Sequence, residues 1–140
     1  MTSMNVIVIE DQPTEAELVR FSLIRNGVDP KMIILGSKAD ALHFFRDGKV
    51  AHHLVDLVIV DLNLGDGFGD ELLPMIRERV ATKTQIVILT GSFERASMDL
   101  CFQLGANACY VKPTRSEELS SIFHNIIRDR LGHIVQSARS

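Results

Sequence analysis

The chain has 140 residues, of which 46% are hydrophobic and 24% are charged, and its formal net charge is −3. These values predict one globular domain, and the acidic balance argues against a nucleic-acid surface, which needs clustered lysine and arginine. With no apolar stretch of membrane-spanning length, no signal-peptide pattern and no Cys-x-x-Cys pair, we expect a cytoplasmic protein that does not contact a membrane.

Apolar runs rich in valine and isoleucine recur about five times along the chain. Each run is short and apolar throughout, which predicts a strand that is buried on both faces of a sheet. The five predicted strands lie near residues 5–10, 32–35, 57–61, 86–90 and 108–111.

The segments between these runs have helical patterns. The second and last helices are predicted from apolar stripes, namely Ala41, Leu42, Phe44 and Phe45 for one, and Leu119, Ile122, Phe123, Ile126 and Ile127 for the other. Thr14 with Glu17, Thr114 with Glu117 and, more weakly, Ser37 with Asp40 have the spacing of helix-capping pairs, and Gly27 stands where a helix should end. A third helix is predicted to start near Asp70, with Pro74 in its first turn.

Strict alternation of strands and helices predicts an α/β fold with a parallel sheet covered by helices on both faces. We expect one domain over residues 1–130, followed by a short tail over residues 131–140 that is too small to be an output domain.

Polar residues follow the apolar runs at the ends of four predicted strands. Glu10 and Asp11 follow the first, Asp61 closes the third, Thr90 closes the fourth and Lys112 follows the fifth. Ligands of open parallel sheets bind beyond the carboxyl ends of the strands, so we expect these five residues to gather at one edge.

Three converging carboxylates repel one another unless they are protonated or bind a cation. Oxygen ligands at a partly wet edge suit Mg²⁺, or Mn²⁺ in its place, and the backbone carbonyl of Asn63 is positioned to add a ligand. Asp61 is then the candidate nucleophile, since a carboxylate can attack phosphorus to form an acyl phosphate. Lys112 and Thr90 would balance charge on the phosphoryl oxygens.

The segments VIVIEDQP, VIVDLNLGDGFGDELL, ILTGS and LGANACYVKP resemble the receiver domain of bacterial response regulators over about residues 4–130. The resemblance implies a flavodoxin-like (βα)5 fold of strand order 2-1-3-4-5, the order of the stand-alone chemotaxis receiver. It implies a single-domain phospho-accepting switch, rather than an enzyme, that works in a two-component system or phosphorelay.

The same resemblance implies roles for individual residues. Asp61 would accept phosphate from a sensor histidine kinase or a histidine phosphotransfer protein. Asp11 and Asp61 would bind Mg²⁺ directly, Glu10 would act through water, and Thr90 and Lys112 would contact the phosphoryl group. A cis bond before Pro113 is also implied. The signal would leave by protein contact, and the face formed by the fourth helix, fifth strand and fifth helix is the family's usual choice, with a homodimer as one form of that contact.

The chain departs from the family pattern three residues before Lys112. Receivers usually carry a tyrosine or phenylalanine there, whose ring moves together with the threonine, whereas this chain has Cys109, and Tyr110 comes one place later. Successive strand residues point to opposite faces, so Tyr110 is not placed to replace the missing ring.

Two other functions compete with the signalling switch. A phosphatase of the haloacid-dehalogenase kind also uses an aspartate nucleophile and Mg²⁺, but it needs the nucleophile on the first strand and a second aspartate two residues later, where this chain has Asn63. A flavin carrier on the same fold needs a phosphate loop after the first strand, whereas the chain has the acidic pair Glu10 and Asp11 there.

Overall fold

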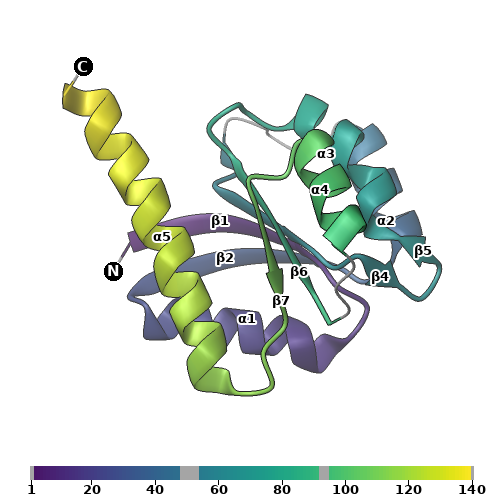
Figure 1. Cartoon of the computed structure of the whole chain (residues 1–140), viewed down its shortest axis with the longest axis horizontal. Helices are drawn as coiled ribbons and strands as arrows, with labels where there is room; N and C mark the ends of the chain where they lie inside the picture. The colour runs from purple at the N-terminus through teal and green to yellow at the C-terminus, as the bar shows by residue number, and fades with distance from the viewer. Residues whose placement is uncertain (1, 48–53, 92–94, 140) are drawn as a thin grey trace.

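The computed structural model describes residues 2–47, 54–91 and 95–139, with side chains described over 2–47, 54–91 and 98–129. Its strands and helices alternate along the chain (Figure 1). The long strands are β1 (Thr2–Ile9), β2 (Val28–Leu35), β3 (Leu57–Val60), β6 (Gln85–Thr90) and β7 (Ala108–Val111). The helices are α1 (Pro13–Arg25), α2 (Lys38–Arg46), α3 (Leu73–Arg79), α4 (Arg95–Gln103) and α5 (Ser116–Arg139).

The long strands form one parallel sheet in the order β2-β1-β3-β6-β7. Since β6 and β7 are the fourth and fifth long strands, this is the predicted order 2-1-3-4-5. The numbering differs because a short hairpin of β4 (Asn63–Leu64) and β5 (Gly67–Phe68) follows β3. The predicted α/β fold with a doubly wound parallel sheet is confirmed.

The sheet separates two apolar cores, because neighbouring residues of a strand point to opposite faces. Ile7 and Ile9 of β1 lie in the core beneath α2, α3 and α4, whereas Val6 and Val8 lie in the core beneath α1 and α5. Figure 1 shows the same two layers of helices. A strand buried in this way is apolar at every position, which is why β1, β3 and β6 are evident in the sequence.

The predicted helix signals agree with the structure in part. The Ser37 hydroxyl accepts a hydrogen bond of 2.9 Å from the Asp40 N–H, and Gly27 follows α1 at a φ of 79°. The prediction of a helix cap at Thr14 is wrong, because Pro13 occupies the start of α1 and Gln12 is the capping residue. Proline suits a first helical position, so it moves the start of the helix ahead of Thr14.

Helices α3 and α5 differ from the predicted bounds. The segment that starts near Asp70 is first a 3₁₀ helix, η2 (Gly69–Leu72), and α3 continues it with Pro74 in its first turn. Residues 131–139 of the expected tail over residues 131–140 continue α5, whose last turns extend beyond the sheet (Figure 1). Within the described parts of the chain, no helix is long and apolar enough to span a membrane.

The end of the sheet opposite the predicted site is tied together by Arg77 of α3. Its guanidinium donates hydrogen bonds to the Gly105 carbonyl at 3.1 Å, the Thr84 carbonyl at 3.1 Å and Asn107 Oδ1 at 2.7 Å. Asn107 Oδ1 also accepts a bond of 2.7 Å from the Ile86 N–H. The segments before β6 and β7 are therefore fixed to one side chain.

Candidate functional site

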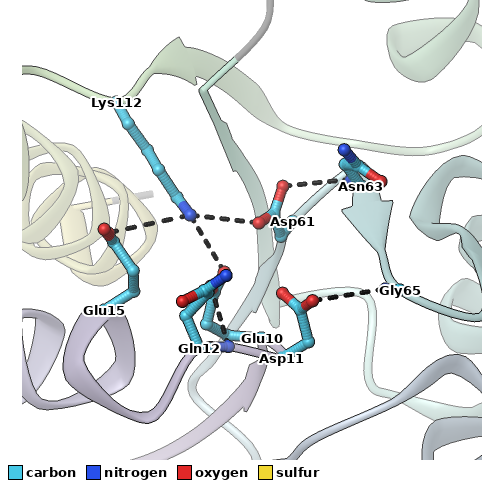
Figure 2. Close-up of polar contacts among 8 residues, drawn as sticks. All are labelled: Glu10, Asp11, Gln12, Glu15, Asp61, Asn63, Gly65 and Lys112. Carbon is cyan, nitrogen blue, oxygen red and sulfur yellow. Dashed lines mark hydrogen bonds and ion pairs between the residues drawn. The ribbon is translucent and has the colours of Figure 1, made fainter.

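The predicted acids Glu10, Asp11 and Asp61 and the predicted lysine, Lys112, lie together at the carboxyl edge of the sheet, beyond the ends of β1, β3 and β7 (Figure 2). The backbone continues the sheet's hydrogen bonding past the strand ends, since the Asp61 N–H donates to the Ile9 carbonyl and the Lys112 N–H to the Thr90 carbonyl. The backbone that carries these side chains is therefore fixed by hydrogen bonds to the neighbouring strands.

Three carboxylates converge there. Glu10, Asp11 and Asp61 each offer an oxygen, and these oxygens lie within 4.8 Å of one another. Glu10 and Asp61 are 5% and 6% exposed, so water screens them little, while Asp11 is half-buried. Hard oxygen donors at this spacing are a donor set that suits Mg²⁺ or Mn²⁺.

Lys112 supplies the positive charge of the site. Its Nζ lies 3.0 Å from Glu10 Oε2, 3.0 Å from Asp61 Oδ2 and 3.7 Å from Glu15 Oε2. Burial alone would lower the pKa of Lys112, but its hydrogen bonds to Asp61 and Glu10 outweigh that effect and raise the pKa. Lys112 is therefore a fixed cation between two nearly buried carboxylates.

Glu10 is the carboxylate that responds most to its surroundings. Burial, followed by its hydrogen bond with Asp61, raises the pKa of Glu10 from 4.5 to about 7, although Lys112 acts in the opposite direction. Without a metal ion, a proton on Glu10 relieves its repulsion with Asp61. A bound divalent cation would remove the need for that proton.

The backbone of the hairpin also contacts the carboxylates (Figure 2). The Asn63 N–H donates to Asp61 Oδ1 at 3.1 Å, and the Gly65 N–H donates to Asp11 Oδ2 at 3.3 Å. These bonds orient the two acids toward the space between them.

Thr90 and Gly91 form another wall of the site. Thr90 is fully buried at the end of β6, and both residues line an open cavity of about 580 Å³. The remaining lining comes from the acids, the lysine and the hairpin, namely Asp11, Gln12, Glu15, Asp61, Asn63, Gly65 and Lys112. The cavity is therefore lined by carboxylates, a hydroxyl and an ammonium group.

The two residues at the unusual switch position lie on opposite faces of the sheet, as predicted. Cys109 packs in the core beneath α2, α3 and α4, where its thiol contacts Cys101, while Tyr110 packs in the core beneath α1 and α5. Burial raises the pKa of the Cys109 thiol to about 11. Neither side chain reproduces an aromatic ring on the α4 side of β7.

The cis bond implied before Pro113 is wrong for this structure, since the described residues contain no cis peptide bond. The trans form is favoured before proline by about 0.5–1 kcal/mol in the absence of other constraints. The trans connection still brings Lys112 Nζ to Asp61.

Three residues near the site were not among the predicted site residues. Glu15 reaches Lys112 from the first turn of α1, and Gly69 approaches Asp61 so closely that a Cβ at this position would overlap the Asp61 carbonyl oxygen. Asp66 accepts two backbone hydrogen bonds from the start of α2, which lower the pKa of its carboxyl. Each contact joins segments that are far apart in sequence or depends on a tight turn, so spacing alone gives no signal.

The fold and the site define an α/β domain with an acidic pocket and a lysine at the carboxyl edge of a parallel sheet. Residues 6–124 match the family model described as the response regulator receiver domain. The chain belongs to this family, whose members are phosphoryl-accepting signalling domains of two-component systems rather than classical enzymes.

Individual relatives agree with this assignment. The cell cycle transcriptional regulator CtrA of Caulobacter vibrioides is 31% identical over 130 residues, which cover 93% of this chain and 53% of that protein. The transcriptional regulatory protein AruR of Pseudomonas aeruginosa is 29% identical, over 95% of this chain and 52% of that protein. The chain thus spans about half the length of these relatives.

A solved structure also has this fold. A response regulator receiver domain from Rhodospirillum rubrum superposes with a TM-score of 0.75 at 27% identity, covering 88% of this chain and 90% of that one. Similarity to receiver domains leaves neither the phosphatase nor the flavin carrier favoured.

Proposed function

We propose that this chain is a signalling switch that accepts a phosphoryl group on Asp61 from a phosphohistidine of a sensor histidine kinase or a histidine phosphotransfer protein. The observation that carries the proposal is the position of Asp61. Its carboxylate is nearly buried, lies within 4.8 Å of the Glu10 and Asp11 oxygens and is 3.0 Å from an ammonium group.

The residues present fit a divalent metal ion. Asp11, Asp61 and the Asn63 carbonyl would hold Mg²⁺ or Mn²⁺ directly, and Glu10 would act mainly through water. The ion, when bound, would neutralise the phosphoryl oxygens. One support is the oxygen-only donor set. Another is a response regulator of Burkholderia pseudomallei that was solved with a phosphorylated aspartic acid, a calcium ion and citrate. It is 26% identical to this chain with a TM-score of 0.66, and the match covers 83% of this chain and 64% of that one.

In the transfer step, an Asp61 oxygen forms a bond to phosphorus while the bond between phosphorus and the imidazole nitrogen breaks. The electron pair of that bond stays on the imidazole. The Lys112 ammonium, which is hydrogen-bonded to Asp61, would donate a hydrogen bond to a negatively charged phosphoryl oxygen. The Thr90 hydroxyl would donate a hydrogen bond to another phosphoryl oxygen. Gly91 has no side chain to obstruct the group, and nothing lies within 4 Å of the position its Cβ would take.

The acceptor can be tested with acetyl phosphate and intact-mass measurement. In the presence of Mg²⁺ the wild-type chain should gain one phosphoryl group and Asp61→Asn should gain none. Asp29→Asn, an exposed carboxylate near the opposite end of the sheet, is the matched control and should behave as wild type. A phosphoryl group retained by Asp61→Asn would identify another acceptor and contradict the proposal.

The signal would leave through the face formed by α4, β7 and α5. Leu100 and Phe102 of α4 and Val111 of β7 are 44%, 49% and 43% exposed, which supports a protein-contact surface there. A homodimer through this face is one form of that contact. Size-exclusion chromatography with and without beryllofluoride tests it, and a mass that beryllofluoride does not change would argue against a phosphorylation-dependent dimer.

A further inference from the structure

The short hairpin of residues 63–68 begins two residues after Asp61 and contacts two of the acids of the site. Its Asn63 N–H donates to Asp61 Oδ1 at 3.1 Å, and its Gly65 N–H donates to Asp11 Oδ2 at 3.3 Å. One short hairpin thus donates a hydrogen bond to each of two carboxylates that follow different strands of the main sheet.

The hairpin has few contacts of its own to hold its turn. Only two residue pairs join its strands, Asn63 with Phe68 and Leu64 with Gly67. Leu64 is buried, but Gly65 and Asp66 at the turn are exposed. A two-stranded hairpin of this length is not stable by itself in water, so the position of its turn depends on neighbouring elements.

The turn is fastened to the amino end of α2 through Asp66. Its Oδ1 accepts a hydrogen bond of 2.8 Å from the Lys38 N–H, and its Oδ2 accepts one of 2.9 Å from the Ala39 N–H. The first N–H groups of a helix have no partner inside the helix, so a carboxylate from another segment satisfies them well.

The Lys38 side chain reinforces this attachment. It forms an ion pair with Glu71 and lies over the hairpin so closely that a Cβ at Gly67 would be 2.5 Å from Lys38 Cδ. The Lys38 side chain thus lies against the hairpin and joins the start of α2 to the η2 segment.

We infer that Asp66 is a positioning residue for the metal site, because it holds the turn of the hairpin whose backbone N–H groups bond to Asp11 and Asp61. The inference rests on the proposed function, since it assigns Asp66 to the metal site of that function. Asp66 touches neither of the two acids and acts only through the hairpin. Groups that orient metal-binding carboxylates commonly change metal affinity by 10-fold or more when they are removed.

The test compares two side chains that bond to the same end of α2. Asp66→Ala removes the bonds to the hairpin turn, whereas Ser37→Ala removes the bond from the Asp40 N–H and leaves the hairpin untouched. Both changes should lower the melting temperature of the metal-free protein. Only Asp66→Ala should raise the Kd for Mg²⁺, by about 10-fold in titration calorimetry.

Two further measurements separate positioning from general stability. Hydrogen exchange of the Gly65 amide should be faster in Asp66→Ala but not in Ser37→Ala. Asp66→Asn keeps a carbonyl acceptor and should give a Kd between those of wild type and Asp66→Ala, which keeps the inference testable if Asp66→Ala folds poorly.

The possible results are distinct. If wild type binds Mg²⁺ and Asp66→Ala binds it equally well, the inference is wrong and the proposed function stands. Equal increases of Kd in Asp66→Ala and Ser37→Ala would also overturn the inference, because they would show a general effect of α2. A wild-type chain that binds no Mg²⁺ would overturn the metal site of the proposed function together with the inference.

Discussion

The protonation of Glu10 is expected to depend on whether a cation occupies the acidic site. Glu10 is nearly buried, it shares a hydrogen bond with Asp61 and its pKa is raised to about 7. Burial is the main cause of the raised pKa, and the hydrogen bond with Asp61 and the negative charge of Asp61 raise it further. The protonation of Glu10 and the binding of a cation are therefore alternative ways to reduce the same repulsion.

The raised pKa predicts a pH dependence of stability in the metal-free protein. Because the pKa of Glu10 is about 7 in the folded chain and 4.5 ordinarily, the folded chain binds this proton more tightly. The resulting stabilisation is complete below pH 4.5 and is lost as the pH rises to about 7. Between these values the free energy of unfolding should fall by up to about 3 kcal/mol more in wild type than in Glu10→Gln.

Urea unfolding in the presence of a chelator measures this difference. Glu17→Gln, which removes an exposed glutamate of α1, controls for the loss of one negative charge. Parallel pH profiles of wild type and Glu10→Gln would contradict the assigned role of Glu10.

Lys112 is expected to oppose metal binding in the resting site while favouring the phosphorylated state. Its ammonium lies 3.0 Å from oxygens of both Glu10 and Asp61, where it repels a second cation. Lys112→Met should therefore lower the Kd for Mg²⁺ by about 10-fold, measured by calorimetry, and should slow phosphorylation by acetyl phosphate. Loss of Mg²⁺ binding in this variant would show that Lys112 helps to hold the ion.

At the scale of elements, the strands were predictable because burial on both faces leaves an uninterrupted apolar run. β2 was predicted only in part, over residues 32–35, because it is an edge strand with exposed positions and includes Pro30, which an edge strand tolerates. The Ser37 cap was predictable because it depends on residues three apart. The hairpin of residues 63–68 was not, since strands of two residues leave no periodic pattern.

The connection from Asp61 to η2 depends on a glycine at position 69. A Cβ there would overlap the Asp61 carbonyl oxygen and lie 2.9 Å from Val60 Cγ1. Gly69→Ala should therefore destabilise the protein by about 3 kcal/mol in urea unfolding. It should also slow phosphorylation of Asp61, because the backbone of the acceptor must move.

Gly36→Ala is the matched control for this change. Gly36 also follows a strand at the same edge of the sheet, but nothing lies within 4 Å of the position its Cβ would take. Equal stability of Gly69→Ala and wild type would show that the acceptor segment accommodates a side chain.

At the scale of the molecule, the sequence predicted the fold and the set of residues at the active edge. Both follow from strand order, since parallel strands bring their carboxyl ends together. The finer contacts were not predictable. The approach of Glu15 to Lys112 and of Asp66 to α2 depends on how loops turn back onto the sheet, and residues about 97 and 27 positions apart leave no local pattern.

The two cores are expected to unfold together because one sheet separates them. Phe45 and Phe123 are fully buried, one on each side of that sheet. Phe45→Ala and Phe123→Ala should each cost about 3–5 kcal/mol, and unfolding should remain a single transition. Circular dichroism and the fluorescence of Tyr110 should give the same midpoint in urea, and separate midpoints would indicate two independent folding units.

The hydrogen bonds of Arg77 have a consequence for how movement can spread from Asp61, the proposed acceptor. They hold Gly105 and Asn107, the residues that link the end of α4 to β7, against α3. This attachment leaves α4 a fixed pivot at its carboxyl end, remote from Asp61. We therefore expect any response of α4 to a phosphoryl group on Asp61 to be a tilt about that pivot, and not a slide along the sheet.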